Sequence, residues 1–278
     1  MRCLNAGHES REYDRLKSSP SYFYESKQSG EQPISSVHQG FKCRYAYGRA
    51  AETVMQSEKG QDYMGFAVDG GICSFVLCDG VGLSYRGDFA SKFLGSNLLA
   101  WLRQGNELSA HHLEHKLHEL TVASTQEADL YRVEDNTPQL LKEVLLEKQR
   151  LGSESMYICG RIELPNRFQR KGKLWLAWQG DSRLRLFHDH KELSHRFGDH
   201  FRTAERWSTR NGSVGGKPHV YQCRFDNLSG YRLLMYSDGL NDLDPISQIV
   251  PDDEVQVLMN ALHTGGLEDD ASFLEIMW

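Results

Sequence analysis

Three turns that contain aspartate lie next to the most apolar segments of the chain. Asp79 ends the run VLCDGVG, Asp238 ends LMYSDGLND, and Asp269 opens LEDDASFLEI. A fourth aspartate, Asp62, leads directly into the apolar segment YMGF. If these segments are central strands, their ends place the carboxylates at one rim, where they repel one another unless a cation lies between them. Oxygen ligands of this kind suit Mg²⁺ or Mn²⁺ better than Zn²⁺.

Each of these turns taken alone is also typical of an ordinary loop, because Asp-Gly is among the commonest turn dipeptides. The order and the setting of all four together favour the metal site. The sequence contains no Gly-x-Ser-x-Gly elbow that would indicate a serine nucleophile. We therefore expect chemistry that depends on the aspartates.

The apolar pattern predicts the elements that position these aspartates. Two short runs joined at Asp69-Gly70-Gly71 predict a β-hairpin, and the spacing of apolar residues over 87–104 predicts a helix packed on a sheet. Strands and helices then follow without regular alternation, which indicates an α+β fold of two mainly antiparallel sheets stacked face to face with helices outside. One further helix is expected to carry Leu113, Leu117 and Leu120, and another to open at Pro138 and carry Leu141, Val144 and Leu145. A last helix is expected at 252–263, and the further strands at 155–164, 173–181, 182–189, 219–225, 231–239 and 271–278.

The chain divides into an N-terminal arm and one domain. Residues 1–40 are rich in Ser, Glu, Gln, Lys and Gly, a composition that buries too little apolar area to offset the entropy of ordering, so we expect a mobile arm. The aromatic run Tyr22-Phe23-Tyr24 leaves open that part of it docks on the body. Residues 41–278 show no repeat and no linker, which favours a single domain.

Composition excludes several classes of function. The net charge of −6 and the sequence pI of about 6.1 give no basic footprint for nucleic acid or an anionic membrane. No run approaches the ~20 apolar residues of a membrane-spanning helix, and the first residues lack an apolar signal segment, so we expect a cytoplasmic protein. The six cysteines are scattered without a Cys-x-x-Cys pair, as in a reduced protein.

Seven short segments together resemble the metal-dependent protein phosphatases (PPM), also called type 2C serine/threonine phosphatases. They occur in the order of that family and span most of residues 41–278. The resemblance implies a four-layer α-β-β-α sandwich with two Mn²⁺ or Mg²⁺ ions in the cleft between the sheets. The matching segments are GQD at 60–62, CDGVG at 78–82, GDFAS at 87–91, GS at 152–153, WQGDSRLRLF at 178–187, SDGLND at 237–242 and DDASFLEI at 269–276.

The resemblance also implies roles for individual residues. Asp79 would bridge both ions, and the carbonyl of Gly80 would bind one of them. Asp238 and Asp269 would ligate the other ion, while Asp62 would contribute directly or through water. These aspartates would act in catalysis through the bound metal and water, which attacks phosphorus in line.

The sequence departs from the family at two positions. Members usually carry an arginine that clamps the substrate phosphate five residues before the first aspartate, where this chain has Ser57. Lys59 lies close by and offers a point charge, although not the planar fork of arginine. An aspartate that helps to hold a third ion in many bacterial members corresponds to Gln149, which puts that ion in doubt. Asp181, in the Gly-Asp-Ser-Arg segment, is expected to support a turn.

The segment over 195–219 corresponds to the variable flap beside the cleft in this family. Its cations Arg202, Arg206, Arg210 and Lys217 are candidates for binding phosphate or the phosphopeptide. A solvated loop with ordinary surface charges is the alternative. We include Arg206 and Arg210, with Lys59, as candidate phosphate ligands.

These features predict a phosphatase that hydrolyses phosphoserine and phosphothreonine in proteins by a metal-activated water. Its partner would be a phosphoprotein in signalling, opposing a serine/threonine kinase. Two alternatives stay open. Because of Ser57 and Gln149, the chain is also consistent with a catalytically impaired module that binds phosphoproteins. The same metal centre would also suit a hydrolase of small phosphate esters.

Overall fold

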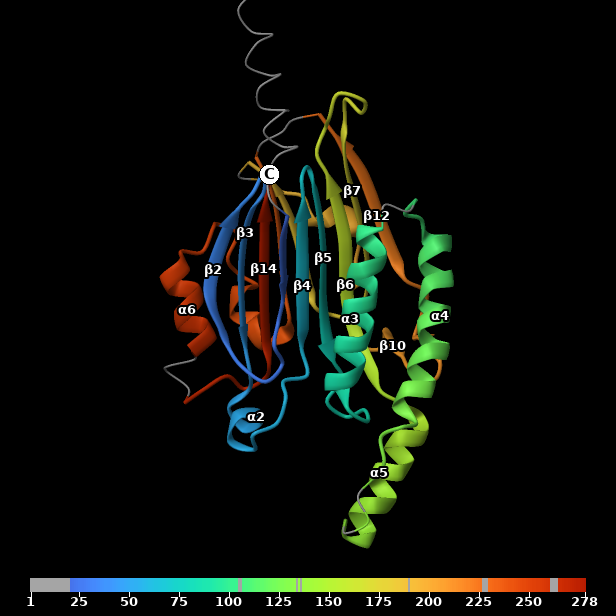
Figure 1. Cartoon of the computed structure of the whole chain (residues 1–278). Coiled ribbons are helices and arrows are strands. Elements are labelled where there is room, and N and C mark those ends of the chain that lie inside the picture. Colours follow the sequence, from blue (N-terminus) through green and yellow to red (C-terminus); the bar gives the residue numbers. More distant parts are fainter. Residues whose placement is uncertain are drawn as a thin grey trace, which may run out of the picture.

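The computed structural model describes residues 21–104, 107–133, 135, 137–189, 191–226, 230–260 and 265–278. Within these residues the strands form two antiparallel sheets that pack face to face, with helices on the outer sides (Figure 1). The predicted α+β sandwich is therefore confirmed. The sheets bring segments that are far apart in the sequence to the same end of the molecule.

The larger sheet has eight strands in the described part of the chain. The predicted hairpin is present, because Asp69 pairs with Ile72 at the turn. The central strands are mostly apolar because one face meets the second sheet and the other meets a helix. The strands are β1 (Tyr22–Glu25), β4 (Tyr63–Asp69), β5 (Ile72–Gly80), β6 (Glu154–Glu163), β7 (Gly172–Gln179), β10 (Arg206–Ser208), β11 (Gly212–Val214) and β12 (His219–Phe225).

The smaller sheet has six described strands in the order β2-β3-β14-β13-β8-β9. Every pair in it is antiparallel. Its strands are β2 (Gln32–His38), β3 (Lys42–Gly48), β8 (Arg183–His188), β9 (Lys191–Glu192), β13 (Tyr231–Tyr236) and β14 (Ala271–Met277).

The helices supply the outer layers. One long helix covers β4, β5 and β6, a second packs on the first, and a shorter one covers β2 and β3. Among the described residues, no helix is both long and apolar enough to cross a membrane. The helices are α2 (Ala51–Met55), α3 (Gly87–Arg103), α4 (Ala110–Ala128), α5 (Gln139–Leu151) and α6 (Asp252–Asn260), with the 3₁₀ segments η1 (Ser194–Phe197) and η2 (Asp238–Leu243).

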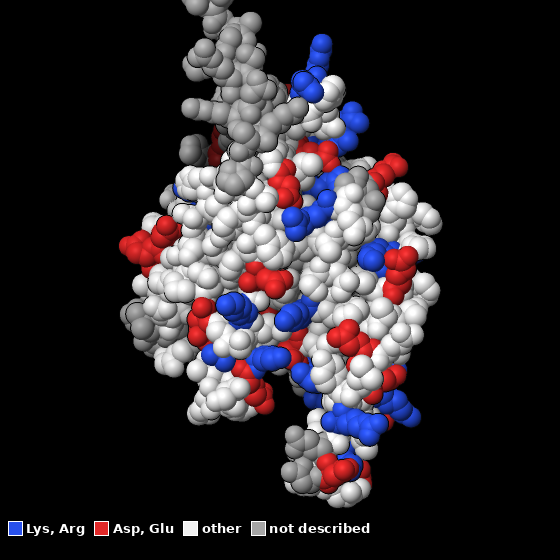
Figure 2. Space-filling model, in the orientation of Figure 1, with Lys and Arg blue, Asp and Glu red and all other residues white. Residues whose placement is uncertain are grey.

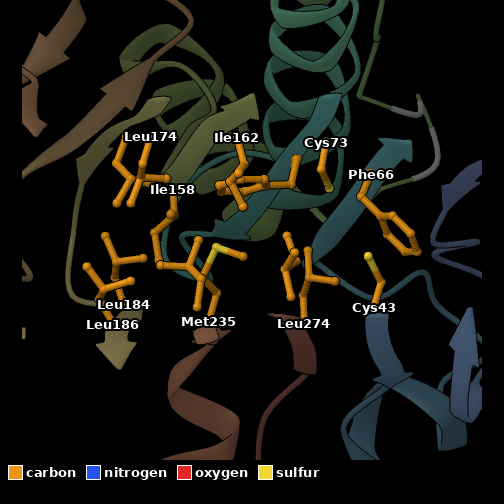
Figure 3. Close-up of a cluster of buried hydrophobic side chains, with 14 of the residues drawn as sticks. Cys43, Phe66, Cys73, Ile158, Ile162, Leu174, Leu184, Leu186, Met235 and Leu274 are labelled. Carbon is orange, nitrogen blue, oxygen red and sulfur yellow. The ribbon is translucent and has the colours of Figure 1, made fainter. Parts of the chain in front are cut away.

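The main core lies between the two sheets. Figure 3 shows side chains of the larger sheet, among them Phe66, Ile158 and Ile162, opposite Met235 and Leu274 of the smaller sheet. A second apolar cluster lies between the larger sheet and helices α3 and α4, and a third lies beneath α6. These three clusters correspond to the three interfaces of a four-layer sandwich.

The predicted mobile arm is wrong for residues 21–40. β1 pairs with β4 at the edge of the larger sheet, and β2 pairs with β3 at the edge of the smaller one. The aromatic residues of β1 explain this difference, because Tyr24 packs on Tyr45 and Phe66 in the core between the sheets. Residues 1–20 lie outside the described residues.

Candidate metal centre

Five aspartates lie at the strand ends on one side of the sandwich. Asp62 precedes β4, Asp79 lies near the end of β5, and Asp181 follows β7. Asp238 follows β13, and Asp269 precedes β14. Antiparallel pairing of β4 with β5 and of β13 with β14 forces these ends together, at the lower edge in Figure 1. In Figure 2 the surface is hollowed at this edge, between the parts that correspond to α2 and α5.

Two glycines allow the backbones at this edge to approach closely. A Cβ atom at Gly80 would lie 2.6 Å from the backbone of Gly87, and one at Gly239 would lie 2.4 Å from the carbonyl oxygen of Asp270. No side chain fits at either position. The glycine of each Asp-Gly pair therefore serves to place its aspartate against the neighbouring element, which a simple turn would not require.

Asp79 lies at the centre of the acidic group. Its pKa is raised well above the usual range by burial and by the charges of Asp238, Asp269 and Asp181. Its backbone carbonyl accepts a hydrogen bond from the Ser155 hydroxyl at 2.9 Å, which fixes the end of β5 against β6. Mutual repulsion among the side chains around Asp79 is the electrostatic setting in which a divalent cation binds favourably.

Asp62 lies deeper than the others, with 2% of its surface exposed. Burial raises its pKa most, Asp79 and Asp270 raise it further, and the nearby Ser237 and Ser272 hydroxyls oppose the rise. The structure therefore brings Asp62 to the site, below the rim rather than on it.

Several buried polar atoms near Asp62 have no hydrogen-bond partner in the described structure. Native interiors rarely leave such atoms unpaired unless an ion or ordered water serves them. The residues present therefore fit a hydrated divalent cation. These atoms are Tyr47 Oη, Gln61 Oε1, Asp62 Oδ2 and Ser272 Oγ.

The side chains do not converge on one point. Among the described residues, no group of three or more His, Cys, Asp or Glu side chains is arranged to hold a single metal ion. Mg²⁺ commonly keeps several waters and takes only one or two protein carboxylates, so a site with few direct ligands suits it. Gly80 follows Asp79 directly at the end of β5.

The sequence did not point to Asp270, which is 3% exposed. Its Oδ1 accepts a hydrogen bond from the backbone N–H of Ala50 at 2.7 Å, and its Oδ2 accepts one from the N–H of Gln61. Asp270 thus ties the start of β14 to the segment that carries Asp62. The pair Asp269-Asp270 was the available signal in the sequence. Successive side chains point to opposite sides of an extended chain, so if Asp269 faces the rim, Asp270 faces inward.

Asp181 is a second aspartate whose position adds to the site. It was expected to support a turn, and its carbonyl does accept a hydrogen bond from Arg183 Nη1 at 2.8 Å. Burial raises the pKa of its carboxyl, and the charge of Asp238 raises it further. The carboxylate therefore contributes to the field around Asp238.

Two candidate phosphate ligands from the flap already pair with carboxylates. Arg206 contacts Glu154 at 2.6 Å, and Arg210 contacts Asp129. The carbonyl of Glu154 accepts the Val81 N–H, so this partner of Arg206 lies on β6 beside the Gly80 end of β5. Arg206 itself is on β10, on the other side of β6. Arg210 is held against the end of α4.

The remaining cations and the departures from the family lie on the surface. Ser57 and Lys59 are exposed after α2, and Arg202 is exposed in the flap. Lys217 pairs with Glu114 at 3.2 Å. Gln149 lies on α5, where its amide donates to the carbonyl of Tyr131 at 2.6 Å. That hydrogen bond gives Gln149 a structural role of its own.

The fold of this chain is similar to that of several solved phosphatase structures. The serine/threonine phosphatase Stp1 from Staphylococcus aureus matches 91% of this chain and 99% of its own, with a TM-score of 0.54 at 15% identity. A bacterial serine phosphatase matches 84% and 96%, with a TM-score of 0.54 at 17% identity. The chain has the fold of the metal-dependent protein phosphatases. No protein-family model and no curated protein matches the sequence.

A third structure with this phosphatase fold was solved with a metal. RsbX in complex with magnesium matches 88% of this chain and 98% of its own, with a TM-score of 0.54 at 12% identity. At identities this low the similarity shows the shared fold. The aspartates of this chain occupy the strand ends of that phosphatase fold.

The raised pKa values predict how pH affects the stability of this phosphatase fold. Asp62 and Asp79 both keep protons in the folded state above their unfolded pKa of about 3.9. The protonated carboxyls therefore stabilise the folded state fully below that pH. This stabilisation is lost as the pH rises through the folded pKa and the carboxyls ionise. A divalent cation binds the deprotonated form, so Mn²⁺ should raise the Tm more at pH 8 than at pH 5. Calorimetry in Mn²⁺ and in EDTA tests this, and equal shifts at both pH values would contradict it.

Replacing Asp270 tests its role in the phosphatase fold. Asp270→Asn keeps the shape but has one carbonyl oxygen, so the N–H of Ala50 or of Gln61 loses its acceptor. We expect the free energy of unfolding to fall by about 1–3 kcal/mol, measured in urea without metal. Asp199→Asn, at an exposed position, is the control and should change it by less than about 0.5 kcal/mol. Equal effects of the two variants would argue against the role of Asp270.

Proposed function

We propose that the protein is a Mn²⁺- or Mg²⁺-dependent phosphatase that hydrolyses phosphoserine and phosphothreonine in proteins. The observation that carries the proposal is the placement of Asp79 among Asp181, Asp238 and Asp269 at the strand ends of a phosphatase fold. The natural partner would be a phosphoprotein that a serine/threonine kinase phosphorylates in the cytoplasm.

The aspartates would hold two ions. Asp79 would lie between them and Gly80 would offer its carbonyl to one, while Asp238 and Asp269 would hold the other. Asp62, which is buried beneath Asp79, would act through water. When bound, the metals would acidify a water and neutralise charge on the phosphoryl oxygens. Asp270 would keep Asp62 and Asp269 in position through its two backbone hydrogen bonds.

The protein cations would orient the phosphate. Lys59, Arg206 and Arg210 remain the proposed ligands, and Arg206 is favoured because its partner Glu154 lies next to the Gly80 end of β5. An arginine that already pairs with a carboxylate is held in one orientation, which limits the entropy lost when it binds an anion. The third ion expected in some family members is not part of the proposal, because Gln149 replaces the aspartate.

Phosphate release from defined substrates tests the function. The full chain should release phosphate from a phosphothreonine peptide in Mn²⁺, and should release none in EDTA. A phosphotyrosine peptide of the same sequence is the matched substrate control and should react far more slowly. Absence of release in Mn²⁺, or release that persists in EDTA, would overturn the proposal.

The same experiment separates the two alternatives. If p-nitrophenyl phosphate reacts much faster than the peptide, the chain is a small phosphate-ester hydrolase. If calorimetry shows that the phosphopeptide binds while Mn²⁺ does not, the chain is a phosphoprotein-binding module. Either outcome would replace the proposed activity while leaving the fold unchanged.

A further inference from the structure

A cavity of about 460 Å³ lies on the helix side of the larger sheet, away from the aspartates. It is lined by β6, β7 and β12 and by the segment that leads into α4. On β6, Arg161 in the cavity lies six residues beyond Ser155, which pairs with Gly80. At about 3.3 Å per residue the cavity is about 20 Å from the candidate metal centre.

Two cations of this cavity face each other without a carboxylate between them. Lys173 of β7 and Arg224 of β12 are directly opposite in the strand register, and both are exposed. Within the described ranges, no carboxylate lies within ion-pairing distance of either one. Glu163 is opposite Lys173 on β6, but its carboxylate is bound to Arg161. Like charges directly opposite on neighbouring strands destabilise a sheet, and an anion would relieve that cost.

A third cation is built into the wall. Arg161 is 8% exposed, and its Nη1 donates to the carbonyl of Leu102 at 2.9 Å, at the last turn of α3. Its Nε donates to Glu163 at 2.9 Å, so the guanidinium is fixed in place. Counting Glu107 and Glu163 against the three cations, the lining keeps a net positive charge. The whole chain, by contrast, carries −6.

The rest of the lining is apolar. Trp175 is 5% exposed and packs edge-on against Trp101, with ring centroids 5.9 Å apart. Leu108 lines the cavity from the segment before α4. Pockets for small ligands typically combine such apolar walls with a few polar groups that fix orientation, in volumes of about 300–1,000 Å³.

We propose that this cavity binds a small organic anion, with its phosphate or carboxylate between Lys173 and Arg224 and an apolar body against Trp175 and Leu108. The site is separate from the candidate metal centre and does not depend on the proposed function. It lies at the end of α3 opposite Gly87, the residue that contacts Gly80, so one helix touches both sites.

Calorimetric titration with phenylphosphonate tests the proposal. This probe carries an anionic group and a ring, and its carbon–phosphorus bond resists hydrolysis. The titration is done in EDTA, so that any cation at the aspartates is removed. We expect saturable binding to the full chain, with the double variant Lys173→Gln and Arg224→Gln weakened at least tenfold. Methylphosphonate, which lacks the ring, should bind more weakly.

Two control proteins locate the site. Lys92→Gln with Lys191→Gln removes the same charge at exposed positions that do not line the cavity and should bind normally. Asp79→Asn should also bind normally. The proposal is overturned if the wild type does not bind, if both double variants weaken binding equally, or if Asp79→Asn abolishes it. Equal affinity for methylphosphonate would overturn the apolar part of the assignment.

Discussion

Replacing Asp79 by asparagine should nearly abolish metal-dependent phosphate release and at the same time stabilise the metal-free protein. The activity should fall because Asp79 is proposed to hold both ions, whose loss removes several kcal/mol of transition-state stabilisation. We expect a decrease in kcat/KM of about a thousandfold or more. The stability should rise because the pKa of Asp79 is raised by burial and by the neighbouring carboxylates, whose repulsion the amide relieves.

Two measurements with opposite signs make this prediction specific. The Tm in EDTA at pH 8 should increase by about 2–4 °C for each kcal/mol relieved. Asp226→Asn is the control, because Asp226 is exposed and pairs with Lys171 outside the candidate centre. It should leave both the activity and the Tm unchanged. A variant of Asp79 that retains activity would remove this residue from the proposed centre, and a lower Tm would show that its charge is structurally required.

The second large effect is expected at Glu275 in the smaller sheet. Glu275 is 1% exposed, and its two oxygens bind Arg44 at 2.7 Å and Arg232 at 3.1 Å. Both arginines are also buried, and both donate to backbone carbonyls of the segment 247–250. Glu275→Ala leaves buried Arg232 without a carboxylate, and Arg44 keeps only the exposed Asp252. We therefore expect the free energy of unfolding to fall by about 3–5 kcal/mol in urea.

An exposed ion pair provides the control for Glu275. Glu31 pairs with Arg49 at 2.8 Å, and its own side chain is half exposed. Glu31→Ala should therefore cost about 1 kcal/mol or less. If Glu275→Ala has an effect as small as Glu31→Ala, solvent must reach the buried arginines, and the cluster would not hold the segment 247–250 on the sheet.

Much of the fold could be predicted from local patterns. The turn Asp69-Gly70-Gly71 predicted the hairpin, and the spacing of apolar residues after Gly87 predicted α3. The strands β1 and β2 were not predicted, because their own composition does not favour strands. Their stability comes from pairing, β1 with β4 and β2 with β3. α5 was predicted correctly as a helix, yet none of its residues is buried, because periodicity predicts an apolar face and not whether that face is covered.

The aspartates of the candidate site could be predicted where the residue types in the sequence are themselves diagnostic. Asp79 and Asp238 are each followed by a glycine whose lack of a side chain is needed for close packing, and such pairs can be found in a sequence. Asp270 could not be found in this way, because its importance comes from two backbone N–H groups about 210 and 220 residues earlier in the chain. The flap cations Arg206 and Arg210 likewise have carboxylate partners that only the folded chain brings near.

The N-terminal strands have a consequence for how the protein can be cut and expressed. β1 and β2 cover the open edges of the two sheets, so a chain that starts at residue 41 would leave β4 and β3 with unpaired backbone groups. Exposed edges of this kind pair with other chains and promote aggregation. An expression boundary placed before Tyr22 keeps β4 and β3 covered. A boundary drawn from composition alone would expose them and favour aggregation.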